Sequence, residues 1–140
     1  MRYYIIIASV VFLGLVFPSG TKAELNRFDF VGLWQAIDTL DGSTQLLSIS
    51  CADFNDCDVR LNDTSFTDSC PNQIGFAQGK GSIRGRELTV VLNLTCTNTE
   101  GPSETLSQLN KFVMDLRNGT LINLNDDISP GPNLFYRINQ

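Results

Sequence analysis

The stretch "FVGLWQAIDTLDGSTQLLSISC", residues 30–51, contains two alternating apolar segments separated by an Asp-Gly pair, and it ends on a cysteine. Alternation of apolar and polar residues is typical of a strand with one buried face, and Asp-Gly is typical of a tight hairpin turn. A two-residue turn at Asp41 and Gly42 would place Trp34 inside, on the buried face of an antiparallel hairpin. The predicted opposed pairs are Gly32 with Cys51, Trp34 with Ile49, and Ala36 with Leu47.

The same pattern recurs along the chain, where short apolar segments are cut by Gly, Pro, Asn and Asp. The segments that we expect to be strands lie at roughly 30–38, 45–51, 57–62, 76–83, 87–96, 105–116, 120–125 and 133–138. Short strands at this spacing predict an antiparallel meander, and closure into a barrel would remove its exposed edges. We therefore expect an all-β fold, an eight-stranded antiparallel up-and-down barrel with an interior that is filled by side chains or holds one small ligand.

The N-terminal segment resembles a secretory signal peptide, with Arg2 before the apolar run "YYIIIASVVFLGLVF" and the small residue Ala23 at a plausible cleavage point. The apolar run, about 15 residues, is shorter than the roughly 20 that a membrane-spanning helix needs. We expect residues 1–23 to be a signal peptide and 24–140 to be a single β-barrel domain. The predicted location is secreted or extracellular, with no membrane attachment after cleavage.

The charge balance of the expected mature chain is acidic. Of the 10 basic residues, Arg2 and Lys22 lie in the predicted signal peptide, which leaves 8 against 15 acidic residues and a formal net charge of −7. No basic cluster is present to neutralise phosphates, so nucleic acid is excluded as a partner. The sequence does not define an oligomeric state.

Four cysteines, in a chain predicted to enter an oxidising compartment, indicate two disulfides. A zinc site is the alternative, but the chain has no histidine and its cysteine spacings of 6, 13 and 26 are not those of zinc knuckles. Cys51 and Cys57 flank one hairpin, and Cys96 falls opposite the region just before the fourth strand, close to Cys70. We predict the pairs Cys51–Cys57 and Cys70–Cys96, with no metal and no cofactor.

A second hairpin is predicted around Gly85 in "AQGKGSIRGRELTVVLNLTC", residues 77–96. Its expected inward pairs are Ala77 with Leu94, Gly79 with Leu92, Gly81 with Val90, and Ile83 with Leu88. Glycines weaken a strand unless something approaches the backbone closely. Two interpretations stay open for Gly79 and Gly81: a bulky ring such as that of Trp34 covers them, or they leave room for a ligand.

Three Asn-x-Ser/Thr sequons begin at Asn62, Asn93 and Asn118. Each is expected on an outward face or in a turn. We predict glycosylation at one or more of them if the source is eukaryotic.

The segment "FDFVGLWQAI", residues 28–37, resembles the first strand of calycins, the superfamily of lipocalins and fatty-acid-binding proteins. In that superfamily a Gly-x-Trp near the start places the Trp at the closed end of an eight-stranded barrel, where a basic side chain from near the last strand stacks on it. The resemblance implies that Gly32, Trp34 and Arg137 close the barrel. The tight first hairpin is nearer to avidins and small proteinase-inhibitor barrels, although Trp34 is the only tryptophan and an avidin-type biotin pocket is therefore absent.

Catalysis is disfavoured, because a chain without histidine cannot form a Ser-His-Asp or Cys-His arrangement. Carboxylate pairs remain, Asp38 with Asp41 and Asp53 with Asp56 and Asp58, but acidic residues in turns usually cap backbone amides. The run "DFNDCD" lacks the Gly and the distant Glu of a calcium-binding loop. We therefore predict a protein that is not an enzyme.

The leading hypothesis is a secreted binding module with a small apolar ligand at one end of the barrel, contacted by Trp34, Phe76 and Tyr136. Asp38 is expected near the rim, on the inner face. The alternative is an extracellular protein-interaction or proteinase-inhibitor-like module that acts through its loops at 52–56, 63–73 and 126–132. Outward-facing Leu33, Ile37 and Leu46 would form an apolar strip, covered by the N-terminal segment or available to an extracellular protein.

Overall fold

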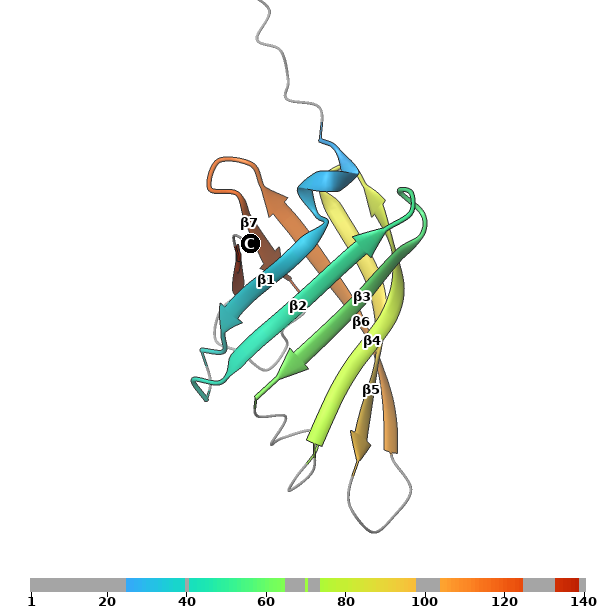
Figure 1. Cartoon of the computed structure of the whole chain (residues 1–140), viewed down its shortest axis with the longest axis vertical. Coiled ribbons are helices and arrows are strands. Elements are labelled where there is room, and N and C mark those ends of the chain that lie inside the picture. Colours follow the sequence, from blue (N-terminus) through green and yellow to red (C-terminus); the bar gives the residue numbers. More distant parts are fainter. Residues whose placement is uncertain are drawn as a thin grey trace, which may run out of the picture.

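A computed structural model of the chain describes residues 25–39, 41–64, 70, 74–97, 104–124 and 133–138. Eight strands form one closed antiparallel barrel in sequence order, in which β8 pairs back onto β1 (Figure 1). The strands are β1 (Gly32–Ile37), β2 (Thr44–Cys51), β3 (Cys57–Asp63), β4 (Ile74–Arg84), β5 (Glu87–Thr97), β6 (Glu104–Asp115), β7 (Thr120–Asn123) and β8 (Leu134–Arg137). The predicted all-β up-and-down barrel is confirmed, whereas the predicted signal peptide lies outside the described residues.

The hairpin of β1 and β2 has a longer connection than the sequence predicted. The observed pairs are Gly32 with Ile49, Trp34 with Leu47, and Ala36 with Gln45. The predicted register is therefore wrong by two residues, because the loop does not turn at Asp41-Gly42 alone: the Asp38 amide donates to the Ser43 carbonyl over 2.8 Å. An even shift leaves every side chain on its expected face, and Trp34 still points inward.

The pairing of β4 with β5 follows the predicted register. Ala77 pairs with Leu94, Gly79 with Leu92, Gly81 with Val90, and Ile83 with Leu88. A Cβ added at Gly79 would lie 1.9 Å from the carbonyl oxygen of Val91, and one at Gly81 would lie 2.8 Å from that of Thr89. The backbone of β5 itself occupies the space, in a region where β4 curves strongly in Figure 1. Both interpretations of the glycines, a covering aromatic ring and room for a ligand, are therefore wrong. The glycines allow the close approach of the β5 backbone.

Two disulfides fasten opposite ends of the barrel. Cys51–Cys57 joins directly opposed residues of β2 and β3, and Cys70–Cys96 ties the segment before β4 to β5. These are the two pairs that the cysteine positions favoured. Structural disulfides indicate an oxidising environment of the extracellular type. Within the part of the chain that the structure describes, no helix is long and apolar enough to cross a membrane.

The apolar core lies inside the barrel and is densest beside the short 3-10 helix η1 (Arg27–Asp29). Its largest members are Trp34, Phe30, Phe112 and Phe135, each with no more than 1 % of its surface exposed. The rings of Phe112 and Phe135 meet edge to face, with centroids 5.8 Å apart, an arrangement that aromatic pairs prefer. The interior at this end is therefore filled by side chains.

Candidate functional site

At the η1 end of the barrel, Arg137 lies over the ring of Trp34. The guanidinium carbon of Arg137 lies 4.6 Å from the centroid of the Trp34 ring, within reach of a cation–π interaction. The Trp34 indole N–H donates to the Phe30 carbonyl over 2.8 Å, and Arg137 Nη2 donates to the carbonyls of Phe28 and Asp29. Gly32 adopts a φ of 143°, a conformation that side-chain-bearing residues rarely adopt. These contacts hold η1 across the barrel end.

The three residues expected to contact a ligand do not form one site. Trp34 is 1 % exposed at the closed end, whereas Phe76 is 38 % and Tyr136 is 59 % exposed. Phe76 alternates with the buried Ala77, and Tyr136 alternates with the buried Phe135, so both point to the outside of the barrel. An interior site built from these three side chains is not present.

The inner face changes from apolar to polar toward the opposite end of the barrel, which we call the rim end: β1, β3, β5 and β7 end there. Along β2, the inward residue after Leu47 toward the rim is Gln45, and its partner on β3 is Asp63. Buried asparagines take the equivalent inward places on the other side: Asn110 on β6, Asn123 on β7, and Asn133 just before β8. Polar side chains thus replace the aromatic core at this end.

Gln45 connects several of these polar groups. Its Nε2 donates to Asp38 Oδ2 and to Asp63 Oδ2, each over 3.0 Å, and its Oε1 accepts from Asn133 Nδ2 over 3.2 Å. Because both carboxylate oxygens lie 3.0 Å from one nitrogen, they are at most 3.0 + 3.0 = 6.0 Å apart. Asp38, Gln45, Asp63 and Asn133, the rim cluster, therefore hold two carboxylates close together at the end of the barrel. Asp38 lies on the inner face, where the sequence placed it.

Ser43 adds a further polar group beside the rim cluster. It precedes Gln45 by two residues in the alternating buried positions of β2 and is 8 % exposed. Its amide donates to Asp41 and its carbonyl accepts from Asp38, but its buried Oγ has no hydrogen-bond partner. A buried hydroxyl without a partner is uncommon in folded proteins. Its donor and acceptor are therefore unused in the described structure.

Basic side chains lie away from the rim cluster in the described part of the chain. Arg27, Arg86, Arg117 and Arg137 lie in or beside η1 and the turns of the closed end. Arg60, Lys80, Arg84 and Lys111 take outward positions on their strands, next to the buried residues Val59, Gly81, Ile83 and Phe112. The basic side chains that the structure describes therefore lie at the closed end or on the outer face of the barrel.

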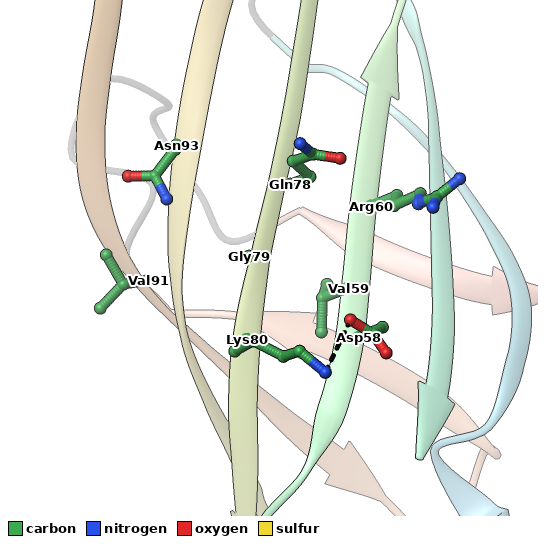
Figure 2. Close-up of a pocket in the computed structure, with 8 residues that line it drawn as sticks. All are labelled: Asp58, Val59, Arg60, Gln78, Gly79, Lys80, Val91 and Asn93. Carbon is green, nitrogen blue, oxygen red and sulfur yellow. Dashed lines mark ion pairs between the residues drawn. The ribbon is translucent and has the colours of Figure 1, made fainter. Parts of the chain in front are cut away.

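An outer hollow of about 500 Å³ lies over β3, β4 and β5 (Figure 2). Lys80 crosses one side of it and pairs with Asp56 at 2.7 Å and Asp58 at 3.0 Å. The hydrogen bonds that Lys80 Nζ donates to the two carboxylates raise the pKa of Lys80. Because all three side chains are more than half exposed, water screens the pairs and they contribute little to stability.

The three sequon asparagines are exposed. Asn62 and Asn93 point outward from β3 and β5, and Asn118 lies in the turn before β7. Asn93 Oδ1 accepts from Ser107 Oγ over 2.6 Å, and Asn118 Nδ2 donates to Asp115 over 2.8 Å. Glycosylation at one or more of them, if the source is eukaryotic, stays a prediction.

A second outer hollow, the seam hollow, opens between β1 and β8. Their pairing includes Trp34 with Arg137 and Gln35 with Tyr136, and it stops before it reaches Ile37 and Leu134, two positions further along. A hollow of about 550 Å³ lies there and is lined by these two residues together with Tyr136 and Ile138. Ile37, at 55 % exposed, and Tyr136, at 59 %, present an apolar surface to solvent. We expected Leu33, Ile37 and Leu46 to form an outer apolar strip, and of these three Ile37 lines this hollow.

The remaining carboxylates have local structural roles. Asp53 Oδ1 accepts from the amides of Asn55 and Asp56 over 2.7 and 3.0 Å, which organises the loop between Cys51 and Cys57. Over the described ranges, no group of three or more His, Cys, Asp or Glu side chains is placed to hold a metal ion.

Sequence reasoning identified Asp38 but missed the rest of the rim cluster and Ser43. The signal was present, because Ser43 and Gln45 interrupt the inward apolar series of Leu47 and Ile49, and Asp63 interrupts that of Val59 and Leu61. Asn133 carried no such signal, since its contact with Gln45 spans 88 residues. Comparisons with protein-family models, with curated proteins and with solved structures find no match for this chain.

Proposed function

We propose that this protein is a secreted binding module that takes one small ligand through the rim end of its barrel. The observation that carries the proposal is the contrast within one interior. The η1 end is sealed by Trp34 and Arg137, whereas the rim end holds the rim cluster and the buried, unpartnered Oγ of Ser43. Sites for small molecules are typically apolar walls with a few convergent polar groups.

Apolar walls are available at the rim as well. Ala77 and Leu92 are buried on the inner face there, and Leu61 and Leu94 are partly buried against the core. A ligand with an apolar body could therefore contact β3, β4 and β5 while its polar end reaches the rim cluster. This changes the expected contacts from Trp34, Phe76 and Tyr136 to residues of the rim. The closure of the opposite end also supports a calycin-like relationship, which we keep as part of the proposal.

Native mass spectrometry tests the proposal on the protein secreted by its own host, before and after mild organic extraction. We expect a stoichiometric small molecule that leaves on extraction and rebinds. Ala77→Phe would fill the inner wall and prevent rebinding, whereas Gln78→Phe, one residue along on the outer face, would leave rebinding intact. A protein mass without any small molecule, together with failure to rebind the extract, would contradict the proposal.

A protein-interaction module is the second candidate function, favoured by the seam hollow. Its exposed Ile37 and Tyr136 would suit an extended peptide of an extracellular partner. Cross-linking through position 136 discriminates between the two functions, since a partner protein adds kilodaltons to the cross-linked product and a small ligand does not. A partner captured at position 136 and lost with Ile37→Arg would favour this second function.

A further inference from the structure

We propose that two copies of this chain associate through the outer wall formed by β7, β8, β1 and β2, with the seam hollow near a two-fold axis. These four strands follow one another around the barrel. The proposal concerns the outside of the barrel and goes beyond the small-ligand function. It also assigns the surface of the seam hollow to a second copy, rather than to a peptide of another extracellular protein.

Charged side chains divide the outer wall into two halves in the part of the chain that the structure describes. Each strand from β3 to β6 carries at least one charged residue at an outward position, among them Asp58, Lys80, Glu87 and Lys111. Figure 2 shows part of this charged half. The outward positions of β7, β8, β1 and β2 carry no charge, and we call this half the uncharged wall.

The charged residue that these four strands do contain is Arg137 on β8. It is directly opposed to Trp34 on β1 and lies over the Trp34 ring at the closed end. Opposed residues of an antiparallel pair share one face of the sheet, and Trp34 is buried inside the barrel. The guanidinium of Arg137 therefore does not interrupt the uncharged wall.

The centre of the uncharged wall is apolar and exposed. Leu134 pairs with Ile122 on β7, and Tyr136 pairs with Gln35 on β1. The side chains of Leu134, Tyr136 and Ile37 are 42, 59 and 55 % exposed. An exposed apolar surface without charge, with a tyrosine among its residues, is typical of the core of a protein interface.

Charge favours a second copy as the molecule that covers this wall. The chain has 15 acidic and 10 basic residues, so two copies repel each other where their charged surfaces meet. Contact through the uncharged wall brings no like charges face to face. A partner of opposite charge would be recognised by ion pairs, and the described outward positions of this wall offer no charged group to form them.

The shape of the wall suits a two-fold contact. In such a contact both copies use the same surface, so a hollow and the side chain that fills it lie close together on one chain. Tyr136 lines the seam hollow of about 550 Å³. It also lies centrally in the wall, because it pairs with Thr120 on β7 and with Gln35 on β1. The Tyr136 ring of each copy can therefore enter the seam hollow of the other.

The size of the wall sets the expected strength of association. Four neighbouring strands at a spacing of about 4.8 Å span about 14 Å, and the six residues of β1 extend over about 20 Å. Such a face is smaller than the roughly 800 Å² that each partner buries in a standard stable interface. We therefore expect a reversible dimer with a dissociation constant on the order of 10–100 µM.

Sedimentation velocity of the secreted, disulfide-bonded protein from about 1 µM to about 1 mM should show a shift from monomer to dimer. Tyr136→Glu should weaken this association at least about tenfold, because two carboxylates would face each other near the axis. Phe76→Glu is the matched control, since Phe76 is an exposed aromatic residue on the charged half, at 38 % exposure. It should leave association unchanged. Unaltered emission of the buried Trp34 verifies that both variants are folded.

Two further measurements distinguish a second copy from other occupants. Raising the salt concentration from about 0.05 to about 0.5 M screens the repulsion between two acidic chains, so the dimer should become tighter, whereas an interface of ion pairs would become weaker. A photo-reactive side chain at position 136 should give a cross-linked product with twice the mass of the chain.

The outcomes separate this inference from the proposed function. A monomer at every concentration, or a dimer that Phe76→Glu dissociates and Tyr136→Glu leaves intact, would overturn the inference. A cross-linked product whose added mass is not that of a second copy would overturn it in favour of another extracellular protein. A dimer that carries no small molecule and does not rebind the extract would support this inference and contradict only the small-ligand function.

Discussion

The two ends of this barrel differ in the side chains that occupy the inward-facing positions of the strands. At the η1 end, Trp34 lies under Arg137, donates its indole N–H to the Phe30 carbonyl and is 1 % exposed. At the rim end, Gln45 gathers two carboxylates, and the Ser43 hydroxyl is buried without a partner. The difference supports our proposal that stability is concentrated at one end and recognition at the other.

The largest expected effect is loss of the closed end by Trp34→Ala. Removal of a large buried aromatic side chain should lower the free energy of unfolding by about 3–5 kcal/mol. Phe76→Ala, on the outer face at 38 % exposure, should lower it by less than about 1 kcal/mol. Chemical denaturation of both variants measures the two changes in the free energy of unfolding. Similar changes would contradict the assignment of Trp34 to the core and of Phe76 to the outer face.

The two disulfides compare the ends directly, since Cys51–Cys57 lies at the η1 end and Cys70–Cys96 at the rim. Their separations in sequence are 6 and 26 residues. Chain entropy predicts that paired alanine substitutions cost about 2–3 kcal/mol for the shorter loop and about 3–4 kcal/mol for the longer one. Chemical denaturation of the two double variants measures which disulfide contributes more to the free energy of unfolding. A greater loss from Cys51→Ala with Cys57→Ala would show that native packing at the η1 end, rather than loop length, dominates.

Arg137 gives a smaller effect at the closed end. Arg137→Ala removes the cation–π contact with Trp34 and the hydrogen bonds to the η1 carbonyls, and should lower the free energy of unfolding by about 1–2 kcal/mol. Arg137→Lys should recover part of the loss, because it keeps the charge but not the planar guanidinium. Unchanged tryptophan emission and stability in the alanine variant would contradict the role of Arg137 in closure.

Asp63 should give the smallest change in stability. Asp63→Asn keeps an oxygen that can accept from Gln45 Nε2 and removes one of two neighbouring like charges, so stability should change by less than about 1 kcal/mol. A thermal melt of this variant beside Trp34→Ala tests the division between the two ends. A loss as large as that from Trp34→Ala would mean that the rim cluster is a structural network.

The sequence predicted the strands because apolar alternation and turn residues are local signals. It also predicted which side chains point inward, even in the first hairpin, where the loop from Asp38 to Ser43 shifted the register by two residues. The close approach of β5 to Gly79 and Gly81 could not be foreseen, because it depends on the bend of both strands. The sequence did not decide whether Phe76 and Tyr136 point inward or outward. A shift of one residue in the alternation of a strand moves every side chain to the other face.

At the closed end, the contact between Trp34 and Arg137 was expected from a resemblance to calycins. That family relationship itself stays a proposal. The rim cluster could be predicted only in part. Asp38 follows directly from the first strand, but the contact between Asn133 and Gln45 joins residues 88 positions apart, and no local pattern encodes that distance. Buried polar side chains in scattered strands become a cluster only when the barrel closes.

Mapping of amide and side-chain NMR shifts during titration with the small molecule extracted from the native protein tests the division between the two ends most directly. Trp34, the only tryptophan, gives one unambiguous indole signal for the closed end. We predict that the side-chain amides of Gln45 and Asn133 and the backbone amides around Asp63 shift, while the Trp34 indole signal stays unchanged. Shifts centred on Trp34, or on Tyr136 at the seam hollow, would contradict recognition at the rim.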